Sequence, residues 1–156
     1  LHAGGIPIAF DQHTRPPNHH NPKGYYELEG GKIINRLIDG TFPLEKFRGM
    51  FIKITAYGLK YLPPGTYKII YSERNIEEIL DSMEKMAGIK DENRNETKEI
   101  FNKLNNMIKN SIFKREDIKV LLINYNEIMT DPDRNIRKIQ NFLSIPDADL
   151  EKMIKG

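Results

Sequence analysis

Apolar and polar positions along the chain follow two different periods, which predict strands and helices in turn. Short apolar or alternating runs, typical of strands, stand at Ile6–Phe10, Met50–Thr55, Tyr67–Ser72 and, most clearly, 118–126 (IKVLLINYN). Apolar residues at helical spacing stand at about 28–39, 75–86, 100–113, 132–145 and 147–154. Strands that alternate with helices, without an internal repeat, predict an α/β domain with a largely parallel sheet.

Two of these helices have clear start signals. Asn75 and Glu78 have the spacing of an N-cap and its capping-box partner, while Asp131 and Pro132 have the spacing of an N-cap and a first helical residue. The segment DQHTRPPNHHNPKGYY at 11–26 is rich in proline and polar residues and predicts a loop. The residues expected to form the core face of the helix at 75–86 are Ile76, Ile79, Leu80, Met83 and Met86.

Composition limits the class of protein. A chain of 156 residues with 38% hydrophobic content can form one domain with a core. Its 24 Lys and Arg against 22 Asp and Glu give a net charge of +2, so we expect neither a nucleic acid nor a membrane as partner. The chain has no cysteine and no apolar segment long enough to span a membrane, which favours a soluble, cytoplasmic protein.

Arg74 and Ser82 form a candidate anion site. Arg74 stands at the carboxyl end of an expected strand, and Ser82 stands two turns into the next helix on the same side. Their Cα atoms are then about 12 Å apart at 1.5 Å per residue. An arginine, a hydroxyl and a helix N-terminus suit a phosphate monoester. The alternative is that Arg74 pairs with Glu77 or Glu78 and that Ser82 is a surface residue.

Two blocks of sequence resemble the sulfotransferase family. The first is KIIYSERNIEEILDSMEKM at 68–86, with Arg74, Asn75 and a serine eight residues after the arginine; the second is VLLINYNEIMTDPDRNIRKIQNFLSIP at 120–146. The head, AGGIPIAFD…NPKGYYELE, is similar to a bacterial branch of the same family. The resemblance implies an α/β, three-layer P-loop-like fold with a mainly parallel central sheet flanked by helices. It also implies 3′-phosphoadenosine-5′-phosphosulfate as the sulfate donor.

The resemblance implies roles for particular residues. Arg74 and Ser82 would bind the 3′-phosphate of the donor, and Tyr125 would lie beside its adenine. Lys53 matches a family lysine that stabilises charge on the bridging oxygen as the sulfuryl group leaves. The family's histidine two positions later is Thr55 here, a poor base, so the base must come from elsewhere.

The loop before the first expected helix supplies candidates for the base and for the acceptor pocket. The candidates for the base are His13, His19, His20, Glu27 and Glu29, and we favour His20 and Glu27. Histidine has a pKa suited to this role, but the alternative is that His19 and His20 form a pair in solvent. The expected acceptor-binding residues are Asn21, Lys23, Tyr25 and Tyr26. The alternative is that the tyrosines pack on the sheet while the charged residues stay in solvent. The four histidines lack the spacing of zinc ligands, so no metal site is expected.

The sequence therefore predicts one sulfotransferase-like domain over residues 1–156. We expect the first strand and the phosphosulfate-binding loop to stand upstream of Leu1, outside this sequence. The expected activity is transfer of a sulfuryl group to a hydroxyl or amine of a small-molecule, glycan or peptide acceptor. The alternative is a non-catalytic binding or assembly domain that has lost the donor loop. A kinase on the same fold is disfavoured because no Walker lysine loop is present.

Overall fold

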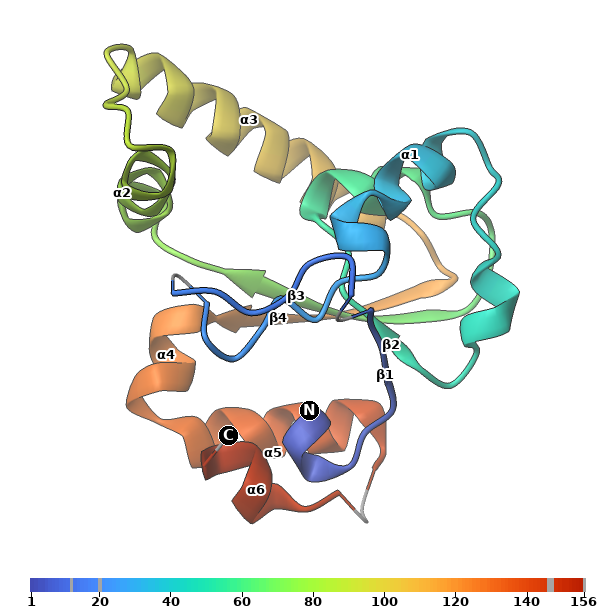
Figure 1. The fold of residues 1–156 in the computed structure, drawn as a ribbon. Coiled ribbons are helices and arrows are strands. Elements are labelled where there is room, and N and C mark those ends of the chain that lie inside the picture. Colours follow the sequence, from blue (N-terminus) through green and yellow to red (C-terminus); the bar gives the residue numbers. More distant parts are fainter. Residues whose placement is uncertain (12, 20, 146–147, 156) are drawn as a thin grey trace.

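The strands of the molecule lie between two groups of helices, as the computed structural model shows for residues 1–11, 13–19, 21–145 and 148–155 (Figure 1). One group consists of α1 (Ile33–Ile38), α2 (Ile76–Ala87) and α3 (Arg94–Phe113). The other consists of α4 (Tyr125–Thr130), α5 (Pro132–Leu143) and α6 (Leu150–Lys155). The N-terminal segment packs beside α6, where the Asp149 amide donates to the Gly4 carbonyl at 3.2 Å. This mixture of strands and helices confirms the α/β class.

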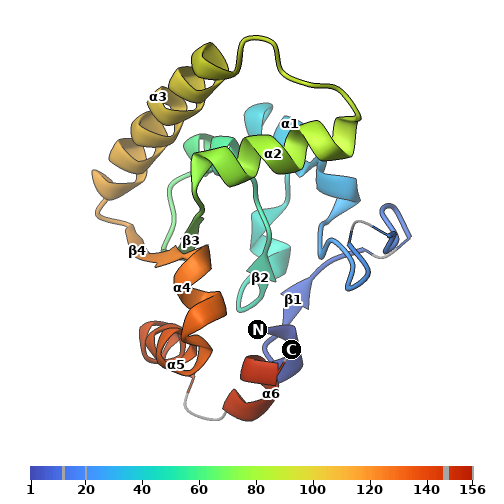
Figure 2. The same cartoon turned by 90° about the vertical axis from the view of Figure 1, so that its left-hand side faces the viewer.

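The four strands within the described residues form two separate parallel sheets. β1 (Ile8–Ala9) pairs with β2 (Phe51–Ile52), and β3 (Tyr67–Glu73) pairs with β4 (Ile118–Asn124) in a register that ends at Glu73 opposite Asn124. In Figure 2 the strands follow the order β4, β3, β2, β1 from left to right. Residues of both β2 and β3 line a cavity of about 1140 Å³. The parallel pairing agrees with the prediction, but the described strands form two pairs rather than one central sheet.

The helix predicted at 28–39 is broken near its start. Gly30 and Gly31 have φ of 60° and 85°, left-handed values that glycine adopts without strain. The segment therefore divides into a 3₁₀ helix at Glu29–Gly31 and α1. Further 3₁₀ helices are His2–Gly4, Leu44–Phe47 and Ala56–Tyr61.

The pair β3–β4 is covered on both faces by two apolar clusters. On the side of α1 and α3, the buried residues include Ile33, Tyr71, Ile108, Ile112 and Ile118. On the side of α5 and α6, the buried residues are Ile6, Ile123, Ile136, Ile139 and Met153. A strand buried on both faces needs a nearly continuous apolar run, which explains why 118–126 gave the clearest strand signal.

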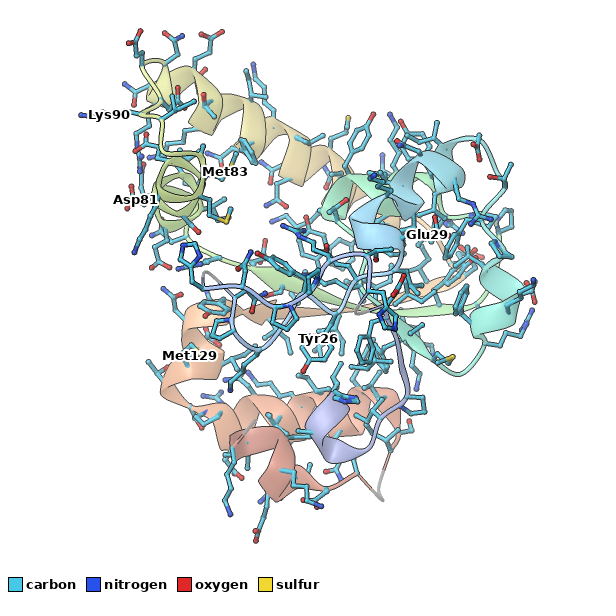
Figure 3. The ribbon with its side chains drawn as sticks, in the orientation of Figure 1. Tyr26, Glu29, Asp81, Met83, Lys90 and Met129 are labelled. Atoms are coloured by element: carbon cyan, nitrogen blue, oxygen red, sulfur yellow. The ribbon has the colours of Figure 1, made fainter. Side chains whose placement is uncertain are left out.

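The prediction that the whole apolar face of α2 is buried is wrong at its C-terminal end. Leu80 is 2% exposed, but Met83 and Met86 are 42% and 54% exposed. The reason is that α2 extends away from β3 after its first turns (Figure 2). Figure 3 shows Met83 pointing from α2 toward the middle of the molecule, whereas Asp81 points outward.

Side-chain caps explain where three of the helices begin. The Asn75 side chain accepts from the Glu77 amide at 2.9 Å and starts α2, as predicted, although the Glu78 carboxylate bonds to other residues. The predicted N-cap Asp131 accepts from the Arg134 amide at 3.2 Å before α5. The unpredicted α4 begins in the same way, since the Asn124 side chain accepts from the next amides. Helix α4 therefore follows directly from the end of β4.

An ion pair between Arg115 and Asp117, with its hydrogen bonds, joins the turn before β3 to the turn before β4. The Arg115 guanidinium donates to the carbonyls of Leu62 and Pro63 at 2.6 and 2.9 Å and contacts the Asp117 carboxylate at 2.5 Å. The same carboxylate accepts from the Gly65 amide at 2.9 Å. The Arg115 guanidinium, and then the Gly65 amide, hold the pKa of Asp117 well below its ordinary value.

We therefore expect the Asp117→Asn variant to have a lower melting temperature at pH 7 than the parent chain. Because the pKa of Asp117 is lower in the folded state than in the unfolded state, its stabilisation is present above about pH 3.9 and is lost as the pH falls. The parent chain should therefore lose more stability than the variant between neutral and acidic pH. Thermal unfolding followed by circular dichroism over this pH range measures the melting temperatures of the parent chain and the variant. Parallel pH curves would contradict the expectation.

Candidate functional site

Three candidate site residues follow the carboxyl ends of strands. Lys53 comes directly after β2, Arg74 directly after β3 and Tyr125 directly after β4. Ligands of open α/β sheets bind at the carboxyl ends of strands, so this is the region where a nucleotide would be expected.

Arg74 and Tyr125 lie together because β3 and β4 end in register. The Arg74 guanidinium carbon is 4.8 Å from the centroid of the Tyr125 ring, within the range of a cation–π contact. Arg74 Nε also donates to the Glu78 carboxylate at 2.8 Å, and the Asn126 side-chain amide donates to the same carboxylate at 2.9 Å. Hydrogen bonds from Arg74 and then Asn126 lower the pKa of Glu78.

The pairing of Arg74 with Glu78 is the arrangement that the sequence left as the alternative to a phosphate site. Both side chains of the pair are more than one third exposed, and such surface pairs contribute little to stability. Breaking this pair therefore costs little stability. Ser82 stands two turns along α2 and is half-buried, one helical turn beyond Glu78.

A second cluster of charged residues surrounds the end of β2. Lys53 Nζ donates to the Tyr25 carbonyl at 2.9 Å and lies 3.1 Å from Oε1 of Glu27. Oε2 of Glu27 accepts from Arg15 at 2.7 Å. The Arg15 guanidinium lies 3.7 Å from the centroid of the Tyr25 ring. The structure thus brings together Lys53, Glu27 and Tyr25, which the sequence proposed separately, and adds Arg15.

Glu27 is held tightly in this cluster. Its side chain is only 11% exposed, and its carbonyl accepts from the Asp11 amide at 2.9 Å. A Cβ at Gly31 would lie 3.1 Å from Oε2, so the glycine leaves room for the carboxylate. Burial opposes ionisation of Glu27, but the hydrogen bonds from Arg15 and Lys53 outweigh it and lower its pKa. Glu27 is therefore an anion at neutral pH.

The predicted acceptor-binding loop is folded on itself. The Asn18 side chain accepts from the Asn21 amide at 3.0 Å and from the Tyr25 hydroxyl at 3.1 Å. Asn21 thus supports the position of Tyr25 through Asn18, and Lys23 stands in the exposed turn that follows. The candidate base His20 lies outside the described residues.

Tyr26 faces the cavity that β2 and β3 share. Its φ is 51°, an uncommon value for a residue with a side chain, and such values concentrate at functional sites. The Tyr26 ring packs on Phe10 and His2, with centroids 5.1 and 5.7 Å apart. Figure 3 shows Tyr26 in the middle of the molecule, between the two groups of helices. The ring contacts of Tyr26 are therefore with aromatic side chains of the N-terminal segment.

The described residues contain no group of three or more His, Asp or Glu side chains that could hold a metal ion. Within the same ranges, no helix is both long and apolar enough to cross a bilayer.

Sequence reasoning missed Arg15 and Asn126. Arg15 stands between two polar residues and a pair of prolines, where nothing in the periodicity distinguishes it. Its contact with Glu27 depends on how the loop folds back. Asn126 lies in the second block that resembles the family, without a role of its own there, and its contact with Glu78 joins α4 to α2. Neither contact has a signal in the local sequence.

Comparison with known proteins identifies the family. A family model described as the sulfotransferase domain matches residues 58–156, nearly two thirds of the chain. The chain therefore belongs to the sulfotransferase family. The matched region contains Arg74, Ser82 and Tyr125, while Lys53 and the loop before it stand outside it. No curated protein and no solved structure matches the chain.

Proposed function

We propose that this protein transfers a sulfuryl group from 3′-phosphoadenosine-5′-phosphosulfate to a hydroxyl or amine acceptor. In this reaction the bond between sulfur and the 5′-phosphate oxygen breaks, and a bond between sulfur and the acceptor oxygen or nitrogen forms. The acceptor loses one proton to a base, and adenosine 3′,5′-bisphosphate is released. The family assignment supports sulfuryl transfer in general. The donor and the residue roles are our proposal.

The observation that carries the proposal is the contact between Arg74 and Tyr125. A guanidinium 4.8 Å from an aromatic ring, at the carboxyl ends of two paired parallel strands, offers both a phosphate ligand and a stacking surface for a base. The N-terminus of α2 follows Arg74 directly and favours an anion. We propose that Arg74 and Ser82 bind the 3′-phosphate and that Tyr125 lies beside the adenine.

Lys53 is the proposed catalytic cation. Its side chain is 52% exposed, so its ammonium group can move toward a bound donor. A cation beside the bridging oxygen would stabilise the negative charge that develops there as sulfur leaves. For the base we favour His20 over Glu27, because both oxygens of Glu27 already contact cations and its pKa is lowered. Asn21, Lys23, Tyr25 and Tyr26 are the proposed acceptor-binding residues.

The cavity between the sheets supports a larger fold than the four described strands. Its lining includes apolar residues of β2 and β3 and many of their neighbours. Unpaired strand edges beside an apolar cavity are costly, because their amides and carbonyls need partners. We propose that a further parallel strand fills this space and completes one central sheet of a three-layer, P-loop-like fold. The phosphosulfate-binding loop would follow that strand, supplied by polypeptide outside these 156 residues.

Calorimetric titration with adenosine 3′,5′-bisphosphate tests the proposal, using both the 156-residue chain and the complete protein. We expect saturable binding with one site, at least in the complete protein, and weaker binding of adenosine, which has no phosphate. If neither folded chain binds the nucleotide, the donor site is wrong. That result would favour the alternative of a non-catalytic binding or assembly domain, in which Arg74 pairs permanently with Glu78.

A further inference from the structure

The Glu27 carboxylate differs from the other ion-paired carboxylates near the site because it is nearly buried and has two cations. Its side chain is 11% exposed, whereas the side chains of Arg15 and Lys53 are 44% and 52% exposed. Each carboxylate oxygen contacts a different cation, Oε2 contacting Arg15 and Oε1 contacting Lys53. The anion is thus fixed in place, while the lysine can move into solvent.

The proposed function requires the Lys53 ammonium group to leave this arrangement. To contact a donor oxygen, the ammonium group must give up part of its contact with Glu27. A carboxylate with so little exposure is strongly destabilised when it has no cation beside it. If Lys53 were the sole partner of Glu27, the cost of that lost contact would oppose donor binding.

We propose that Arg15 is a positioning residue that keeps the Glu27 charge paired, so that Lys53 can exchange Glu27 for an oxygen of the donor. This inference rests on the proposed function, which supplies the anion that Lys53 contacts. Arg15 acts through Glu27 and does not itself contact the donor.

The surroundings of Arg15 fit this role. Its guanidinium packs on the Tyr25 ring at 3.7 Å, and the Tyr25 hydroxyl is held by Asn18 at 3.1 Å. The Tyr25 carbonyl accepts from Lys53, so the same residue contacts both cations. The guanidinium is therefore held from two sides, by a ring and by a carboxylate, while the Lys53 ammonium group contacts the Tyr25 carbonyl and the other oxygen of Glu27. The strength of the Arg15 contact is consistent with the raised pKa of Arg15, whose main cause is the hydrogen bond to Glu27.

The test measures the affinity for adenosine 3′,5′-bisphosphate, which retains the oxygen that the sulfuryl group leaves. The variants are Arg15→Gln, Arg15→Lys, Glu27→Gln and the double variant Arg15→Gln/Glu27→Gln, all in the complete protein. Arg137→Gln is the matched control, because it removes an arginine from an exposed pair with Asp133 on α5. Circular dichroism checks that each variant is folded.

We expect Arg15→Gln to raise the dissociation constant roughly tenfold, an effect typical of a charge left without its partner. The double variant should bind within about twofold of the parent chain, because removal of the Glu27 charge frees Lys53 again; a merely structural role of Arg15 would not be rescued in this way. Arg15→Lys should keep most of the affinity, and Arg137→Gln should keep all of it. Unchanged binding by Arg15→Gln, or a double variant no better than Arg15→Gln, would overturn the inference.

A second measurement needs no donor. The pKa of the Glu27 carboxyl can be followed by carbon-13 NMR in the parent chain and in Arg15→Gln. We expect a higher pKa in the variant, because one of the two cations that lower it is gone. If the parent chain fails to bind the nucleotide, the proposed function fails, and the NMR titration still tests the role of Arg15. An unchanged Glu27 pKa would contradict that role by itself.

Discussion

Replacement of Lys53 by alanine is expected to lower kcat for sulfuryl transfer roughly 100- to 1,000-fold, the size of effect seen when one group that stabilises transition-state charge is removed. The reason is that, in the proposed mechanism, the ammonium group acts on charge that appears only as the sulfur–oxygen bond breaks. Affinity for the intact donor should change much less, because the bridging oxygen carries less charge in the donor than in the transition state or in the released bisphosphate. Steady-state kinetics of the complete protein, with the donor and a screened acceptor, measure both quantities.

Lys152→Ala serves as the control for this experiment. Lys152 also pairs with a carboxylate, that of Asp149 at 2.9 Å, but it is exposed on α6, away from the carboxyl ends of the strands. We expect unchanged kinetics in this variant. A Lys53→Ala protein that is folded and retains full kcat would remove Lys53 from the mechanism.

The second large effect is expected for Arg74→Ala, which should weaken binding of adenosine 3′,5′-bisphosphate roughly 10- to 100-fold. The variant loses a charged donor to the 3′-phosphate, and it also leaves the Glu78 carboxylate facing the ligand without its cation. Both changes weaken binding of the nucleotide. Calorimetric titration of the parent chain and the variant measures the difference.

Two controls make the Arg74 result specific. Adenosine 5′-phosphate lacks the 3′-phosphate, so its affinity should be nearly the same in both proteins. Arg137→Ala removes an arginine from an ion pair of the same helical spacing, with Asp133 at 2.9 Å, and should bind like the parent chain. Equal losses for both nucleotides would show that Arg74 supports the site as a whole rather than the 3′-phosphate.

The sequence predicted helices and strands well where residues close together in the chain determine them. The run at 118–126 forms β4 as far as Asn124, Asp131 with Pro132 starts α5, and the helical spacing after Asn75 corresponds to α2. Each of these signals depends on residues within one or two turns of each other, so the local sequence contains all of the required information.

Predictions that depended on distant parts of the chain were less accurate. The helix expected at 28–39 is interrupted at Gly30 and Gly31, and Met83 and Met86 are exposed although their spacing matches a core face. Spacing shows which residues share a face, but another element must cover that face before it is buried. Only the position of α2 relative to the strands determines how far its apolar face is covered.

The sequence by itself determined the family and most of the order of strands and helices, α4 excepted, and it pointed to Arg74, Ser82, Tyr125, Lys53 and Glu27 as candidates. The tertiary structure alone decided which of them meet. Parallel register brings Arg74 to Tyr125, and a loop that folds back across β2 gives Glu27 two cations, one of which is Arg15. Contacts between residues far apart in the chain depend on strand pairing and loop closure, and the local pattern of residues determines neither of them.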